Sequence, residues 1–157
     1  MAHRTVTEQI TQPAAGHDWA FTPSSGDRVR LLSLTAELFT SSTSANRIVA
    51  LALKDQSGLV YWSTDAVNPQ AASLAVRYNW SRGPGLTVAS TVVTGERIGL
   101  SLPDLWLQPG DVAESITGAI DTADQWSNIV WRGIVADYWE DEERIAAFAQ
   151  MLHGYGG

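Results

Sequence analysis

Apolar and polar side chains alternate along several segments of this chain, and this period of two limits its possible folds more than any other feature. Residues 28–40 read RVRLLSLTAELFT. Every second position in most of this segment is apolar: Leu32, Leu34, Ala36 and Leu38. The positions between them hold Ser33, Thr35 and Glu37. Because successive side chains of a β-strand point to opposite faces, this pattern predicts one long strand with a buried face and a solvated face.

Further strand-like segments follow at the spacing that is typical of a β-sandwich. The expected strands cover residues 46–55, 59–63, 73–80, 86–93, 97–102, 112–120 and 126–139. Turn-forming sequences separate them, such as Gly83-Pro84-Gly85, which lacks the Lys-Ser/Thr of a phosphate loop. No helical segment alternates with the strands, which disfavours a parallel α/β sheet. We therefore expect an all-β fold, an antiparallel two-sheet β-sandwich that is jelly-roll-like.

The two ends of the chain differ from this central part, so we divide the sequence into three. Residues 1–16 are polar and show no sustained period, which predicts an N-terminal arm, either a disordered tail or a segment that orders against a neighbouring subunit. Residues 17–139 form the predicted β-sandwich domain. Residues 140–157 are predicted to form a short C-terminal helix and tail, because EDEERIAAFAQML has acids in its first turn and an apolar stripe behind them.

The composition argues against several classes of function. The chain has no cysteine, which excludes disulfides, thiolate metal sites and cysteine nucleophiles. The net charge is −7, and the cations are nine arginines and Lys54, scattered along the sequence. We therefore do not expect nucleic acid as a partner, because its phosphates repel an acidic domain. We also expect no secretory signal and no membrane span, since no run approaches the roughly 20 apolar residues of a membrane helix.

Few residues have catalytic potential. His3, His17 and His153 lack metal-ligand spacing and are expected at the surface, and no serine has the context of a nucleophile elbow. Asp121 and Asp124 are close enough to hold a cation or to act as an acid–base pair, but their spacing matches no calcium loop. We favour an Asx-type turn for them. The sequence thus predicts no catalytic residue, no cofactor and no metal site.

Seven tryptophans in 157 residues are a high number. Tryptophan packs in protein cores, but it is also enriched at subunit interfaces, and its face can stack on a sugar. The acidic run at residues 140–143 has two explanations, a solvated helix N-terminus or a docking patch for a basic partner. The residues that we consider for an interface are Trp62, Trp80, Trp106, Trp139, Glu140 and Asp141.

A set of turn and strand landmarks lies in order along residues 17–138. They are Trp19, Pro23-x-x-Gly26 with Arg28, Leu31-Leu32-Ser33-Leu34-Thr35, Ser42, Ala45-Asn46-Arg47-x-Val49-x-Leu51, Leu102-Pro103, Pro109-Gly110-Asp111 and Asp124-Gln125-Trp126-Ser127. This set resembles the small β-sandwich structural proteins that tailed bacteriophages encode among their virion genes. The N-terminal arm and the acidic segment match none of these landmarks.

The resemblance implies a non-enzymatic virion component, such as a capsid decoration protein, a head or neck fibre, or a head–tail joining component. Such proteins are commonly trimers or other ring-forming oligomers. The resemblance therefore implies other virion proteins of the capsid or neck as partners, and a homo-oligomer, with a trimer favoured. It also implies a location in the virion after assembly in the host bacterial cytoplasm.

Two other functions remain open from the residues alone. A carbohydrate-binding β-sandwich on a tail or baseplate would need two or three tryptophans exposed together on one concave face. A hydrolase would need a histidine or paired carboxylates in a cleft, which makes the placement of Asp121 and Asp124 the most informative observation.

Overall fold

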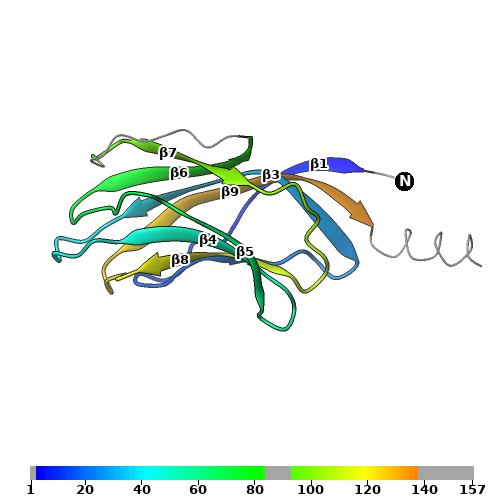
Figure 1. Ribbon diagram of the computed structural model, residues 1–157, viewed down its shortest axis with the longest axis horizontal. Helices are drawn as coiled ribbons and strands as arrows, with labels where there is room; N and C mark the ends of the chain where they lie inside the picture. Colours follow the sequence, from blue (N-terminus) through cyan, green and yellow to red (C-terminus); the bar gives the residue numbers. More distant parts are fainter. Residues whose placement is uncertain (1–2, 84–92, 138–157) are drawn as a thin grey trace, which may run out of the picture.

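The computed structural model describes residues 3–83 and 93–137, and within them it contains nine strands and no helix (Figure 1). The strands are β1 (Arg4–Gln9), β2 (Ala20–Phe21), β3 (Asp27–Phe39), β4 (Ile48–Lys54), β5 (Val60–Asp65), β6 (Ala75–Arg82), β7 (Arg97–Leu102), β8 (Val112–Gly118) and β9 (Gln125–Asp137). The helix expected in residues 140–157 lies outside the described residues, as does nearly all of the strand expected over 86–93.

The strands form two layers that face each other across the core (Figure 1). One sheet has the order β1-β9-β3-β6-β7 and the other the order β2-β8-β4-β5. The predicted all-β fold with two sheets is confirmed. One pairing differs from the purely antiparallel arrangement that we expected: β6 and β7 run parallel, with Tyr78 opposite Ile98 and Trp80 opposite Leu100.

The two longest strands, β3 and β9, form the centre of the five-stranded sheet. Their pairing shifts register between Leu31 and Ser33, and again between Thr35 and Glu37. At the first shift Leu32 is the extra residue, so Leu31 is buried before it and Leu34 after it, while Leu32 itself is only partly buried. The predicted alternation is therefore correct from Leu34 onward and out of phase before it, because one inserted residue moves the following side chains to the other face.

Residues 4–9 of the expected N-terminal arm form β1, an edge strand that pairs antiparallel with β9 and places Val6 opposite Gly133. The expectation of an arm is corrected for this part of the chain. Only Val6 of this strand is even partly buried. The strand therefore lacks the alternation that would have revealed it, because both of its faces remain largely in solvent.

Aromatic rings from both layers meet in the core. Trp19, which immediately precedes β2, packs edge-on against Trp80 of β6 and Trp126 of β9, with ring centroids 6.1 Å and 6.4 Å apart. Tyr78 stacks on Trp80 at 5.8 Å. Edge-to-face and offset contacts of this kind stabilise a core beyond the area that they bury. The two sheets, and with them the outer faces of the sandwich, are therefore held together by a tightly packed core.

Candidate functional site

Asp124, one of the two aspartates considered for chemistry, forms a buried ion pair with Arg47. Neither side chain has any exposed surface. The guanidinium donates from Nε to Oδ2 at 2.8 Å and from Nη2 to Oδ1 at 3.0 Å. The backbone N–H groups of Ser41 and Asp121 donate to the same carboxylate at 2.7 Å and 2.8 Å. Burial alone raises the pKa of Asp124, but these donors more than offset it and hold the pKa below its ordinary value.

Asp121 closes the Asx-type turn that the sequence predicts. Its Oδ1 accepts a hydrogen bond from the backbone N–H of Ala123 at 3.1 Å, and this bond is the main cause of its lowered pKa. Asp121 and Asp124 therefore organise the turn before β9, and neither is among the lining residues of the three pockets around Asn79, Phe21 and Glu96. Among the residues that the structure describes, no group of three or more His, Asp or Glu side chains is arranged to hold a metal ion.

Asp18 also has a structural environment. Its Oδ1 accepts hydrogen bonds from the hydroxyls of Ser115 and Thr117 at 2.7 Å and 2.6 Å. The indole N–H of Trp126 donates to the same oxygen at 3.2 Å. Asp18 thereby ties the segment before β2 to β8 and β9.

The histidines lie apart from these carboxylates. His17 is exposed, and its Nδ1 lies 3.0 Å from the carbonyl oxygen of Ala15. His3 packs against the ring of Trp106 at 5.9 Å between centroids. His153 lies outside the described residues.

The residues that we expected at an interface occupy different environments. Trp62 of β5 and Trp106 are partly buried, and the guanidinium of Arg28 lies 4.7 Å from the centroid of a Trp106 ring. Trp80 is fully buried in the core, so it is a packing residue and not a contact residue of the folded chain. Trp139, Glu140 and Asp141 lie outside the described residues.

The described tryptophans do not form an exposed platform for a sugar ring. Trp19, Trp80, Trp126 and Trp131 are buried. Trp62 and Trp106 are partly buried, and Trp106 already contacts Arg28 and His3. The arrangement that a carbohydrate-binding function would need is therefore not found among them.

Exposed apolar side chains gather instead at the outer strand of the four-stranded sheet. Leu59, Val60 and Tyr61 are 66%, 45% and 41% exposed. Val60 and Tyr61 begin β5, and Leu59 immediately precedes it. This strand is paired on one side only, with β4. An unpaired strand edge keeps a row of backbone N–H and C=O groups available to another chain. We call Leu59, Val60 and Tyr61 the β5 edge.

A fixed turn positions the β5 edge. Asp55 Oδ1 accepts hydrogen bonds from the Ser57 hydroxyl at 2.6 Å and from the backbone N–H of Leu59 at 2.9 Å. The bond from the Ser57 side chain is the main cause of the lowered pKa of Asp55. Gly58 has a φ of 85°, a left-handed conformation that favours glycine. The turn joins the two strands expected over residues 46–55 and 59–63, but the apolar residues that it presents were not singled out from the sequence.

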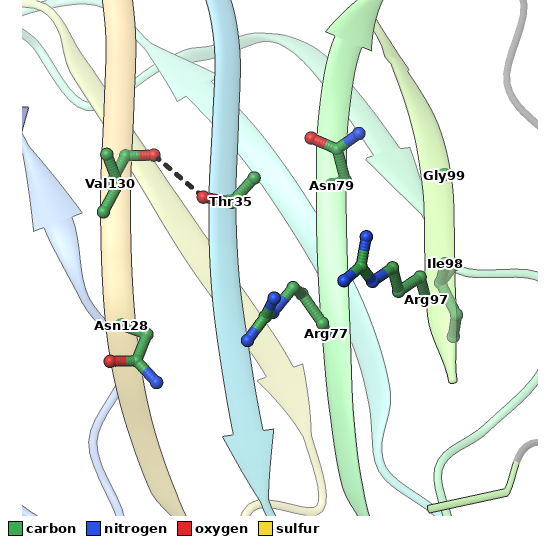
Figure 2. Close-up of a pocket in the computed structure, with 8 residues that line it drawn as sticks. All are labelled: Thr35, Arg77, Asn79, Arg97, Ile98, Gly99, Asn128 and Val130. Carbon is green, nitrogen blue, oxygen red and sulfur yellow. Dashed lines mark hydrogen bonds between the residues drawn. The ribbon is translucent and has the colours of Figure 1, made fainter. Parts of the chain in front are cut away.

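A groove lies on the opposite side of the molecule, on the outer face of the five-stranded sheet (Figure 2). Its volume is about 560 Å³, and β3, β6, β7 and β9 all contribute to it. Its lining residues are Thr35, Arg77, Asn79, Arg97, Ile98, Gly99, Asn128 and Val130. We call this feature the sheet groove.

Two of the polar side chains in the sheet groove are held by Glu37. Arg77 Nη2 lies 3.5 Å from Glu37 Oε2, and Asn128 donates to the same oxygen at 2.9 Å. Arg97 and the side chain of Asn79, by contrast, make no hydrogen bond or ion pair with any other residue that the structure describes. Figure 2 shows the guanidinium of Arg97 reaching from β7 over β6, between Asn79 and Arg77.

The outer face around the sheet groove is more basic than the rest of this acidic chain. Arg132 is exposed and lies opposite Ser33, two residues along β9 from Val130, so it shares the face of the groove. At the far end of the sheet, Arg30 binds Asp104 through two hydrogen bonds of 2.6 Å and 2.7 Å, and Arg82 pairs with the same carboxylate. The bond from Arg30 is the main cause of the lowered pKa of Asp104.

None of the sheet groove residues was singled out from the sequence. The available signal was the polar half of an alternating strand, since Arg77 and Asn79 lie between the buried Val76, Tyr78 and Trp80. This signal marks a solvated face but does not say which strands lie next to it. The pairings of β3 with β9 and of β6 with β7 bring distant segments together, and spacing alone does not reveal them.

Within the described residues there is no helix long and apolar enough to cross a lipid bilayer. No protein-family model matches the chain, and no curated protein matches it either. The two candidate surfaces, the β5 edge and the sheet groove, therefore rest on geometry and chemistry alone.

Proposed function

We propose that this protein is a non-enzymatic structural protein of a tailed-bacteriophage virion that binds other virion subunits. Its most specific form is a capsid decoration protein or a head- or neck-associated assembly protein. The jelly-roll-like form of the sandwich and the homo-oligomer, with a trimer favoured, belong to the same proposal. The observation that carries it is the β5 edge, where exposed apolar side chains and unpaired backbone groups occur together on a packed sandwich.

The chemistry of the β5 edge suits protein–protein association. Native sheets usually protect an outer strand with proline, charge or a covering segment, but the first five residues of β5 read VYWST and contain neither charge nor proline. Exposed apolar groups contribute to binding when a partner removes them from water, at roughly 25 cal/mol per Å² before ordering costs. A virion subunit that adds a strand here gives the unpaired backbone groups hydrogen-bond partners, and an apolar patch on it covers the exposed apolar side chains.

The landmarks behind the family resemblance have structural roles, which also supports the proposal. Arg47 and Asp124 come from two separate landmarks, and they meet in one buried ion pair. Trp19 comes from a third landmark and Trp126 from the same one as Asp124, and their rings pack edge to face in the core. These landmarks therefore specify the packing of the sandwich.

The proposal is tested by binding to assembled particles. We expect the purified protein to co-sediment with phage capsids and to be present in purified virions. Val60→Lys should weaken co-sedimentation by at least about tenfold, because it places a charge among the contact residues of the edge. The matched control is Val67→Lys, since Val67 is 93% exposed and lies beyond the other end of β5.

A protein that is strictly monomeric and absent from purified virions would overturn the proposal. Equal losses for Val60→Lys and Val67→Lys would show that the β5 edge is not the binding surface.

A further inference from the structure

We infer that the sheet groove binds the acidic segment Glu140-Asp141-Glu142-Glu143 of a second copy of this chain. Arg97 supplies the principal contact, and Asn79 and Arg77 supply further donors. This inference goes beyond the proposed function, which concerns the β5 edge on the other sheet.

The groove leaves a set of hydrogen-bond donors available. A guanidinium presents a planar fork of N–H groups that matches a carboxylate, and it is the preferred partner for carboxylates at interfaces. Arg97 has no partner among the described residues, and neither has the side-chain amide of Asn79. Both face the same space, so one acidic side chain can accept hydrogen bonds from the two of them (Figure 2).

The charge of this face also favours an acidic partner. The groove and the face around it carry Arg77, Arg97 and Arg132, against Glu37 on the same side of these strands. Asp27 and Asp137 lie at the far end of the sheet, away from the groove. Glu96, in the turn before β7, accepts a hydrogen bond from the backbone N–H of Val93 at 3.0 Å. The face thus has an excess of positive charge in a chain whose net charge is −7, and it attracts acidic groups.

The sequence points to the acidic group that the groove would hold. The segment 140–143 is the only place in the whole sequence where acidic residues are consecutive. It therefore concentrates negative charge as no other stretch of the sequence does, and it complements the arginines of the groove.

The acidic segment must come from another copy, because that of the same copy cannot span the distance to Arg97. Arg97, Arg77 and Glu37 lie at one level of the sheet, and this level meets β9 at Ser127. The ten residues of β9 from there to Asp137 extend roughly 33 Å.

Residue 143 follows Asp137 by six positions, and six residues reach at most about 22 Å. The acidic segment of the same copy therefore cannot reach Arg97. Contacts of this kind are head-to-tail, because the groove and the segment are different surfaces, and such contacts generate rings when their rotation closes.

The experiment is a charge swap on the full chain, followed by analytical ultracentrifugation. Arg97→Glu reverses the groove, and Glu140→Lys combined with Asp141→Lys, Glu142→Lys and Glu143→Lys reverses the segment. We expect each change alone to weaken self-association by at least about tenfold, and the two together in one chain to restore it to within about threefold of the unmodified protein. Raising salt from about 0.05 M to about 0.5 M should weaken the unmodified protein and the doubly reversed chain alike.

The matched control is Arg4→Glu, which makes the same change of charge on β1. Arg4 is 67% exposed, and its ion pair with Asp27 is long, at 3.8 Å. An effect of Arg4→Glu equal to that of Arg97→Glu would overturn the inference, because it would show a general effect of net charge.

Failure of the combined reversal to restore association would also overturn the inference. A protein that stays monomeric at every salt concentration would overturn it as well. The charge-swap results do not bear on capsid binding through the β5 edge, which Val60→Lys reports separately, whereas a strictly monomeric protein would also remove the homo-oligomer from the proposed function.

Discussion

At the scale of single residues, the buried pair of Arg47 and Asp124 is the interaction whose loss is most costly. Its carboxylate receives four hydrogen bonds, two from the guanidinium and two from backbone N–H groups. Removing one partner leaves a buried charge without compensation. The pair also links the residue just before β4 to the turn before β9. Its loss would therefore loosen the contact between two segments that are distant in sequence.

Arg47→Met should lower the free energy of unfolding by about 3–5 kcal/mol, because Asp124 would keep its burial and lose its counter-charge. Arg47→Met combined with Asp124→Leu should recover part of the loss, since no buried charge would remain but the backbone N–H groups of Ser41 and Asp121 would lose their acceptor. Urea unfolding followed by far-ultraviolet circular dichroism measures both values. A double variant as unstable as the single one would contradict the prediction, because the two backbone hydrogen bonds would then matter as much as the ion pair.

At the scale of elements, strands were predictable where one face of the strand is buried and the other is not. β4, β6, β8 and β9 follow their predicted segments, because each packs one face on the core. β1 was missed because it is solvated on both faces, and the bulge at Leu32 was missed because nothing in the local composition marks an extra residue. The parallel pairing of β6 with β7 depends on long-range packing that no local pattern specifies.

Gly133 offers a test of how closely these elements approach each other. It pairs with Leu31 on one side and Val6 on the other, and an added Cβ would lie 2.9 Å from the carbonyl oxygen of Arg30 and 3.0 Å from the Trp131 ring. Gly133→Ala should lower the free energy of unfolding by about 1–3 kcal/mol, because the backbone or the ring must move.

The matched control for this prediction is Gly118→Ala in β8, where the nearest atom to an added Cβ lies at 3.7 Å, an ordinary contact. We expect a change there of within about 0.5 kcal/mol. Chemical denaturation of both variants gives the comparison, and equal losses would contradict the close approach at Gly133.

At the scale of the whole molecule, the sandwich separates two surfaces of different character. The β5 edge on one sheet is apolar, and the sheet groove on the other is polar and rich in arginine. The sequence indicated no obvious catalytic motif and favoured a binding function, but most of the interface residues that it suggested were tryptophans. Trp80 belongs to the core, and the arginines of the groove come together only when four strands assemble.

Acid should destabilise the whole molecule. Folding lowers the pKa of four aspartates, Asp55, Asp104, Asp121 and Asp124. In the unfolded chain their pKa is about 3.9, so below that pH the unfolded chain binds more protons than the folded one. The contribution of these four aspartates to the free energy of unfolding should therefore be constant above about pH 5 and fall as the pH drops through about 4 toward the lower pKa values of the folded state.

Urea unfolding at a series of pH values measures this dependence. The double variant Arg47→Met with Asp124→Leu provides the control, because it lacks one of the four aspartates and should show a shallower decline. A free energy of unfolding that stays constant down to about pH 3 would contradict the prediction.

The contact of Trp19 with Trp80 and Trp126 has a practical consequence, because it joins rings from both layers. Indoles held at fixed angles a few ångströms apart couple their electronic transitions, so they should give the folded protein a distinctive near-ultraviolet optical signature. Any event that separates the layers would erase this signal, while an event confined to an outer face would preserve it. The molecule thus carries its own label-free reporter, which distinguishes assembly on its surfaces from opening of its interior.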